Sequence, residues 1–150
     1  MLSRQNITVT TDGSAVATGA GIVRSADDPQ VVLVGTGSEV SLCVDAAARL
    51  AEQGVRSQVV SMPSWDRFDE QDAGHKAAVF PAGVPVVSVE AGVTFGWSKY
   101  ADASVGIDRF GASAPGGLVL DKLGINVEHV VVHATDLVNG TTSEHPRSNA

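Results

Sequence analysis

Residues 31–62 read VVLVGTGSEVSLCVDAAARLAEQGVRSQVVSM, and this stretch decides the fold. Residues 31–34 are a continuous apolar run that predicts a strand buried on both faces. Ser38 follows as a predicted N-cap, and the apolar positions after it share one face of a predicted helix over residues 39–53. Gly54 suits the helix end, and residues 55–62 predict a second strand. A strand, a helix and a strand in this order predict a parallel pair joined by a right-handed crossover.

The flanking segments extend this sheet in both directions. Residues 20–24 predict a short strand, and only a tight turn separates it from residues 31–34, so we expect these two strands to pair antiparallel. Residues 84–89 predict a third buried strand and residues 105–107 a further short one. Predicted helices cover residues 65–68, 72–79, 114–123 and, behind an Asn126 cap, 126–138. The fold class is therefore α/β, a three-layer α/β/α sandwich with a mostly parallel five-stranded sheet and one antiparallel edge strand.

Composition limits the classes of function. The chain has 150 residues, 43% hydrophobic and 18% charged, which fits one soluble domain. A formal net charge of −7 argues against binding nucleic acid or an anionic membrane, since both need a basic patch. No apolar run approaches the roughly 20 residues that span a bilayer, and the N-terminus has no signal-peptide pattern. One cysteine, Cys43, excludes an internal disulfide framework, so we expect a cytoplasmic protein.

Two features at strand ends are candidates for a binding site. Gly35-Thr36-Gly37-Ser38 lies between a predicted strand and a predicted helix, where backbone N–H groups of Gly37 and Ser38 could hold an anion. The segment lacks the third glycine of a dinucleotide motif and the lysine of a P-loop, so a tight turn with a helix cap is favoured. Glu90 follows a buried strand, where α/β sheets bind ligands. A structural role, accepting hydrogen bonds from the next loop, is an equal alternative.

Three other features are weaker candidates for chemistry. His129 and His133 have the i, i+4 spacing of a metal pair, but no third ligand is evident and a solvated helix face is favoured. Cys43 falls on the buried face of its helix, which favours a small core residue over a nucleophile. The acidic run that starts at Asp66 matches no calcium loop and is typical of a solvated surface.

Residues 88–117, SVEAGVTFGWSKYADASVGIDRFGASAPGG, hold one of the two tryptophans, the single tyrosine and two of the four phenylalanines. Rings beside glycines, just after the strand that ends at Glu90, describe the edge of an α/β sheet. Such a loop can line an active site or form the surface on which another domain docks. From the residues alone, the chain is a soluble α/β domain without a complete catalytic constellation.

The order of several long motifs resembles the C-terminal domain of transketolase. These motifs are LSRQN at residues 2–6, VVLVGTGSEVSL at 31–42, VVSMPSWDRFDEQD at 59–72, VPVVSVEAGVTFGWSKYA at 84–101, IDRFGASAPG at 107–116 and LDKLGINVEHVV at 120–131. The match covers residues 2–138 in a constant order. The resemblance divides the chain into a linker-like segment at 1–13, the α/β domain at 14–138 and a polar, flexible tail at 139–150.

The resemblance implies part of an enzyme that transfers a two-carbon ketol unit between sugar phosphates with thiamine diphosphate and Mg²⁺. The family's Gly-Asp-Gly cofactor motif lies in its N-terminal domain, and Thr11-Asp12-Gly13 is the nearest string here. The family's catalytic and phosphate-binding residues also lie in the other domains, so none is carried over. We therefore expect a fragment that binds no cofactor or metal and is inactive alone.

This expectation assigns the fragment a role in packing. Its partners would be the other two domains and a second subunit of a homodimer. Phe95, Trp97 and Tyr100 are the predicted docking residues, with part of that aromatic surface exposed in the isolated domain. The alternative is an independent module that binds a small anion or nucleotide at Gly37, Ser38 and Glu90 and has a regulatory role.

Overall fold

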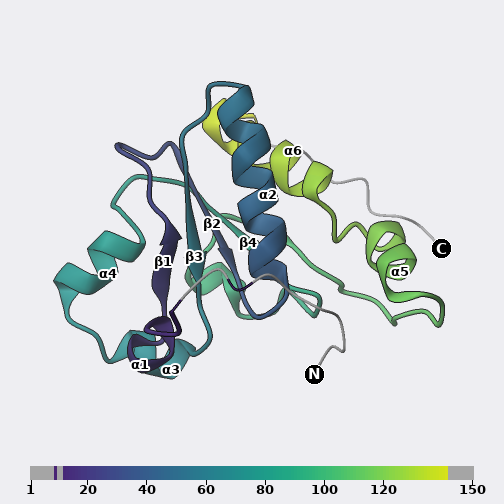
Figure 1. Ribbon diagram of the computed structural model, residues 1–150, viewed down its shortest axis with the longest axis horizontal. Coiled ribbons are helices and arrows are strands. Elements are labelled where there is room, and N and C mark those ends of the chain that lie inside the picture. Colours follow the sequence, from purple (N-terminus) through teal and green to yellow (C-terminus); the bar gives the residue numbers. More distant parts are fainter. Residues whose placement is uncertain (1–8, 10–11, 142–150) are drawn as a thin grey trace.

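The computed structural model describes residue 9 and residues 12–141 as a five-stranded sheet covered by helices (Figure 1). The order of the strands in the sheet is β1-β3-β2-β4-β5. Along the chain the strands are β1 (Gly21–Arg24), β2 (Val31–Gly35), β3 (Ser57–Ser61), β4 (Val86–Val89) and β5 (Ala103–Val105). The helices are α1 (Ala15–Thr18), α2 (Glu39–Glu52), α3 (Trp65–Asp69), α4 (Ala73–Val79), α5 (Gly116–Lys122) and α6 (Val127–Val138), with a 3₁₀ turn at Trp97–Lys99.

The parallel core of the sheet forms as the sequence predicts. β2 is buried along its whole length, and it pairs in parallel with β3 on one side and with β4 on the other. β5 then adds in parallel to β4, with Val87 opposite Ala103. A strand flanked on both edges and covered on both faces excludes water entirely, which explains why residues 31–34 are all apolar.

The partner expected for the first strand was wrong. β1 is the antiparallel edge strand, but it pairs with β3, placing Ile22 opposite Val60, and not with its chain neighbour β2. Both edges of β2 are occupied by β3 and β4, so no edge is free for β1. The burial of β1 alternates between half-buried and exposed residues, as suits a strand at the edge of a sheet.

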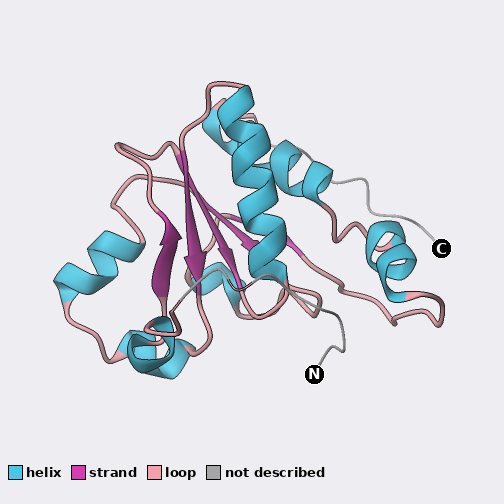
Figure 2. Cartoon of the chain, in the orientation of Figure 1, coloured by secondary structure: helices cyan, strands magenta, loops and turns pink. Residues whose placement is uncertain are grey.

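Helices cover both faces, which confirms the three-layer α/β/α sandwich (Figure 2). On one face α2 and α6 pack on alternate side chains of the central strands, in a core built from Leu33, Leu50, Val59 and Val130, among others. On the other face the opposite side chains of the same strands, such as Val32 and Val60, meet α3, α4 and an aromatic cluster. The two faces differ in kind, because one is aliphatic and the other is rich in rings.

The boundaries of most elements fall within two residues of those predicted. Asn126 caps α6, because its side chain accepts a hydrogen bond from the backbone N–H of His129 at 3.0 Å. β5 is the main shift, since it covers Ala103–Val105 and not residues 105–107. The four-residue α1 was not predicted at all. No helix among the described residues is long and apolar enough to cross a membrane.

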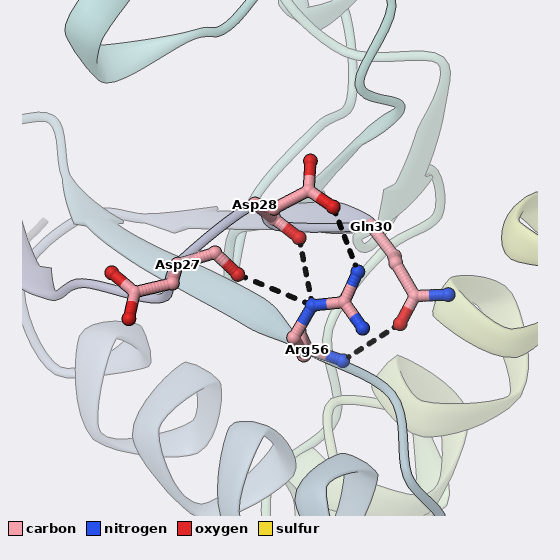
Figure 3. A network of polar contacts seen from close by, with 4 residues as sticks. All are labelled: Asp27, Asp28, Gln30 and Arg56. Atoms are coloured by element: carbon pink, nitrogen blue, oxygen red, sulfur yellow. Dashed lines mark hydrogen bonds and ion pairs between the residues drawn. The ribbon is translucent and has the colours of Figure 1, made fainter.

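Arg56, just before β3, binds the turn between β1 and β2 at the amino end of the parallel strands (Figure 3). Its Nε donates to the carbonyls of Asp27 at 3.1 Å and Asp28 at 2.9 Å, and its guanidinium pairs with the Asp28 carboxylate at 3.0 Å. The backbone N–H of Arg56 donates to the side chain of Gln30. Asp28 has a positive φ of 50°, a conformation that aspartate tolerates better than most residues. These contacts of Arg56 therefore hold the turn that leads from β1 into β2.

Most of the predicted segment 1–13 and most of the predicted tail 139–150 lie outside the described residues.

Candidate functional site

The carboxyl ends of the parallel strands bring together the two sequence-predicted features at strand ends. The loop after β2 carries Thr36, Gly37 and Ser38, and Glu90 follows β4, which is the neighbour of β2 in the sheet. The Thr36 hydroxyl donates a hydrogen bond to Glu90 Oε2 at 2.5 Å. Glu90 therefore acts as an acceptor between two loops at this edge. The donor comes from the loop after β2, not, as predicted, from the loop that follows Glu90.

Ser38 does not cap α2 as predicted. Its φ and ψ are helical and its side chain accepts no capping hydrogen bond. Instead, Ser38 Oγ donates to Glu39 Oε1 at 2.7 Å, and the Glu39 side chain is buried with the residue 6% exposed. The start of α2 thus already holds one carboxylate, and Thr36 in the same loop binds a second one, Glu90. Two carboxylates beside this helix N-terminus weigh against a bound anion there, so the anion-binding alternative gains no support from this geometry.

Gly37 in this loop serves its turn, and Gly35 at the end of β2 serves the packing of strand and helix. Gly37 has a positive φ of 51°, a conformation that costs other residues energy. A Cβ on Gly35 would lie 3.1 Å from Cys43 Sγ and 3.2 Å from the α2 backbone, so this glycine allows the close approach of helix and strand. Both roles agree with the tight-turn interpretation of the segment.

Trp97 and Tyr100 pack within the domain. Trp97 is 2% exposed and packs edge-to-face on Trp65, the first residue of α3, with ring centroids 5.0 Å apart. Tyr100 is half-buried and packs on Trp65 at 5.4 Å and on Phe68 at 6.0 Å. These rings form the aromatic core on the α3 and α4 face of the sheet. Their location explains why the loop after β4 follows a fixed path.

Asp69 holds the same loop from the end of α3. Its carboxylate accepts hydrogen bonds from Lys99 Nζ and from the Tyr100 hydroxyl, the latter at 2.9 Å. These bonds, that from Lys99 above all, lower the pKa of Asp69 below its ordinary value. The acidic run of the sequence therefore contains at least one residue that fixes the aromatic loop, in addition to the Asp72 cap of α4.

Phe95 differs from the other two predicted docking residues, because it is 88% exposed. Docking by Phe95 stays a prediction, while Trp97 and Tyr100 already have partners inside the domain. The structure also reveals a second exposed ring, Phe110, at 97% exposure. Phe110 lies in the quoted stretch 88–117, but residues 108–113, before the predicted helix, have no helix or strand period, so the sequence pattern could not say whether its ring is buried.

Hydrogen bonds join the loops that carry these two rings. The backbone N–H and the hydroxyl of Thr94 donate to the two carboxylate oxygens of Asp108, each at 2.8 Å. The backbone N–H of Ile107 donates to the Gly92 carbonyl at 2.7 Å. The loop after β4 and the loop after β5 are therefore fixed side by side at the carboxyl edge of the sheet.

Comparisons with known proteins agree on one family. The family model of the transketolase-like TK C-terminal domain matches residues 19–126. A transketolase from Nostoc sp. is 48% identical over 128 residues, which cover 82% of this chain and 19% of that protein. The chain belongs to this family.

Solved transketolase structures have the same fold. The enzyme from Leishmania mexicana superposes with a TM-score of 0.85 at 48% identity, covering 94% of this chain and 20% of that one. The Pichia stipitis transketolase in complex with sedoheptulose 7-phosphate gives a TM-score of 0.82 at 37% identity, covering 88% and 20%. This transketolase C-terminal domain thus spans about one fifth of the length of the relatives that it matches.

The residues considered for metal or thiol chemistry are not gathered into a metal-binding cluster in the described part of this transketolase domain. Among residues 12–141, no group of three His, Cys, Asp or Glu side chains is placed to hold a metal ion. His129 follows the Asn126 cap on the first turn of α6. Cys43 is fully buried, and burial raises the pKa of its thiol, so it is a core residue and not an activated nucleophile.

Thiamine diphosphate with Mg²⁺ does not fit the described residues. A diphosphate needs donors or cations, but the start of α2 carries the buried carboxylate of Glu39, and Glu90 is bonded to the loop just before it. A magnesium ion needs clustered oxygen ligands, and the described part of the chain offers no such cluster of acids. No catalytic step is therefore assigned to residues of this domain.

Proposed function

We propose that this chain is the C-terminal domain of a transketolase and that it supports the assembly of the enzyme without supplying catalytic groups. The observation that carries the proposal is the family match over residues 19–126, together with relatives named transketolase. The reaction of the whole enzyme would be transfer of a two-carbon ketol unit between sugar phosphates. Thiamine diphosphate and Mg²⁺ would bind to the part of the enzyme outside this domain.

The geometry supports a packing role in two ways. The polar groups at the carboxyl edge of the sheet satisfy one another, since Glu90 binds Thr36 and Glu39 binds Ser38. In contrast, the apolar rings at the same edge include two, Phe95 and Phe110, that the domain leaves exposed. An edge whose carboxylates are already hydrogen-bonded and whose aromatic rings are exposed is suited to binding another protein surface and not to catalysis.

The assembly in which the domain works is also part of the proposal. We expect two copies of the full-length polypeptide to form a homodimer in the cytoplasm. Two of the relatives are named chloroplastic transketolases, so the cytoplasm is not the location of every relative. The mass of the full-length enzyme in solution would give the number of subunits.

Ketol transfer measured on two proteins tests the proposed function. The first is the 150-residue chain, and the second is a chimera in which this chain replaces the matching C-terminal part of the Nostoc sp. transketolase. Both receive thiamine diphosphate, Mg²⁺, an aldose phosphate and sedoheptulose 7-phosphate, the sugar phosphate bound by the Pichia stipitis enzyme. We expect turnover by the chimera and none by the chain alone. Turnover by the chain alone, or a folded but inactive chimera, would contradict the proposal.

A further inference from the structure

The strongest unexplained feature of the domain is an exposed apolar surface on two joined loops. We call it the Phe95–Phe110 surface and define it as the side chains of Val93, Phe95, Arg109 and Phe110. Val93 is 60% exposed, Phe95 88% and Phe110 97%. Scattered apolar residues on a surface need no explanation, but these residues flank a single hydrogen-bonded junction, the pair Thr94 and Asp108.

The loops beneath this surface are held by more than one contact. Besides the junction, the backbone N–H of Glu90 donates to the Val105 carbonyl at 3.0 Å, and that of Ile107 donates to the Gly92 carbonyl. Gly106 lies where a Cβ would come within 2.4 Å of the Thr94 methyl group, so the two loops are in tight contact. Rings on fixed loops bind with a smaller loss of conformational entropy than rings on mobile ones.

The chemistry of the surface is that of an interface centre. Aromatic rings and arginine are the residue types most enriched where binding energy concentrates. Arg109 is exposed and makes no hydrogen bond or ion pair with any residue that the structure describes. The occupant should therefore present apolar side chains to Phe95 and Phe110 and a carboxylate or carbonyl oxygen to Arg109.

The size of the surface distinguishes between two occupants. Two phenylalanines bury about 150–250 Å² each, so with Val93 and Arg109 the surface offers about 600 Å². A stable interface between separate molecules buries about 800 Å² per partner, which is more than this surface provides. A covalently linked partner needs less area, because the linker gives it a millimolar effective concentration. A tethered occupant is therefore favoured over a second free copy of this chain.

The comparisons indicate what is tethered. The matched relatives are about five times as long as the matched segment, so four fifths of a transketolase polypeptide is attached to such a domain. We infer that the Phe95–Phe110 surface docks on that remaining part of a transketolase polypeptide, with Arg109 pairing with one of its oxygen atoms. This inference rests on the proposed function and adds the residues that carry the contact.

Hydroxyl-radical footprinting measures the exposure of each ring directly and tests the inference. The free 150-residue chain is compared with the chimera that joins this chain to the remainder of the Nostoc sp. transketolase. We expect labelling of Phe95 and Phe110 to fall about tenfold in the chimera, because two exposed rings become buried. Phe80, which is partly buried inside the domain, is the internal control and should keep its labelling. Unchanged labelling of Phe95 and Phe110 in the chimera would overturn the inference.

Two further arms separate the alternatives. If labelling of the rings in the free chain falls as its concentration rises, a second copy is the occupant and the inference is wrong. The double variant with Phe95→Ser and Phe110→Ser should lower the melting temperature of the chimera but leave that of the free chain unchanged, since both rings are exposed there. An equal effect on both proteins would contradict docking.

The outcomes also distinguish the inference from the proposed function. A chimera that is active but leaves both rings exposed would retain the function and refute the docking surface. A chimera whose rings are protected from labelling but which shows no ketol transfer would support the docking surface and refute the proposed function.

Discussion

The contact between Gly106 and Thr94 gives the sharpest test of how the loops at the carboxyl edge are held. A Cβ built on Gly106 would lie 2.4 Å from Cγ2 of Thr94 and 3.0 Å from the carbonyl oxygen of Gly92. Gly111, on the same loop, has no heavy atom within 4 Å of its Cβ position. Neither glycine has a φ in the left-handed region, so alanine is compatible with both backbones. The pair Gly106→Ala and Gly111→Ala therefore isolates the effect of the contact.

The magnitude follows from how the overlap can be relieved. Ordinary carbon–carbon contacts are about 3.5–4.0 Å, so the distance of 2.4 Å is more than 1 Å too short. Thr94 could rotate its methyl group away only by giving up the hydrogen bond from its hydroxyl to Asp108. Overpacking of this kind costs about 1–3 kcal/mol, and the stiffer unfolded chain of alanine offsets about 0.4–1 kcal/mol. We expect Gly106→Ala to lower the free energy of unfolding by about 1.5 kcal/mol and Gly111→Ala to leave it unchanged or slightly raised.

Urea denaturation followed by tryptophan fluorescence measures this difference. Trp97 is buried and Trp65 contacts it, so the loss of their packing reports the unfolding of the domain. With a typical slope of about 1–3 kcal/mol per molar urea, Gly106→Ala should shift the midpoint down by about 0.5–1.5 M at an unchanged slope. A Gly106→Ala midpoint within error of the Gly111→Ala midpoint would refute the reasoning.

A double-mutant cycle tests the assigned partner. Thr94→Ser removes Cγ2 but keeps the hydroxyl that binds Asp108, so it should restore most of the stability lost by Gly106→Ala. We expect a coupling of about 1 kcal/mol between the two positions. Additive losses in the double variant would show that the methyl group is not the obstacle.

Three further contacts give predictions. Arg56→Ala should lower the free energy of unfolding by about 1 kcal/mol in urea titrations, because exposed charged contacts contribute little more. An unchanged free energy of unfolding would show that the contacts of Arg56 with the β1–β2 turn are not stabilising. The hydrogen bond from Lys99 is the main cause of the lowered pKa of Asp69, so the stabilising contribution of this carboxylate is complete above about pH 4 and is lost as pH falls through the pKa of the folded state. On acidification, the urea midpoint should therefore fall more steeply in the wild type than in Asp69→Asn. An equal fall of the midpoint with pH in both proteins would contradict this. Thr135→Val should raise the melting temperature, with a gain of about 0.5–1 kcal/mol, because Thr135 Oγ1 is buried without a hydrogen-bond partner among the described residues; a loss of stability would show that the hydroxyl is satisfied.

The sequence was sufficient to predict the layers of the fold because burial and period coincide there. Residues 31–34 are apolar on both faces of β2, and the helix after them has one apolar stripe, so each pattern has one structural solution. The partner of β1 could not be predicted in the same way. Closeness along the chain favoured β2, but the edges of β2 are filled by β3 and β4, which arrive later in the sequence. Strand order is a property of the whole sheet and not of neighbouring segments.

The candidate site shows the same division between what local patterns determine and what they do not. The position of Glu90 after a buried strand could be predicted, because the strand itself has a clear pattern. Its donor, Thr36, is 54 positions away and was fixed only when β2 and β4 became neighbours. The exposure of Phe110 depends on whether any element covers it. The helix that follows it, α5, lies at the periphery of the domain (Figure 1) and contributes no buried residue.

A single glycine determines how the aromatic stretch is shared between the interior and the surface. Phe95 and Trp97 are two residues apart, yet one is 88% exposed and the other 2%. Gly96 between them has a φ of +90°, and a Cβ there would lie 2.9 Å from the Trp65 ring. The turn at Gly96 lets Trp97 enter the aromatic core while Phe95 stays outside, because only glycine combines that backbone with contact against a ring. The same loop can therefore be anchored to its own domain by one ring and present the other to a neighbour.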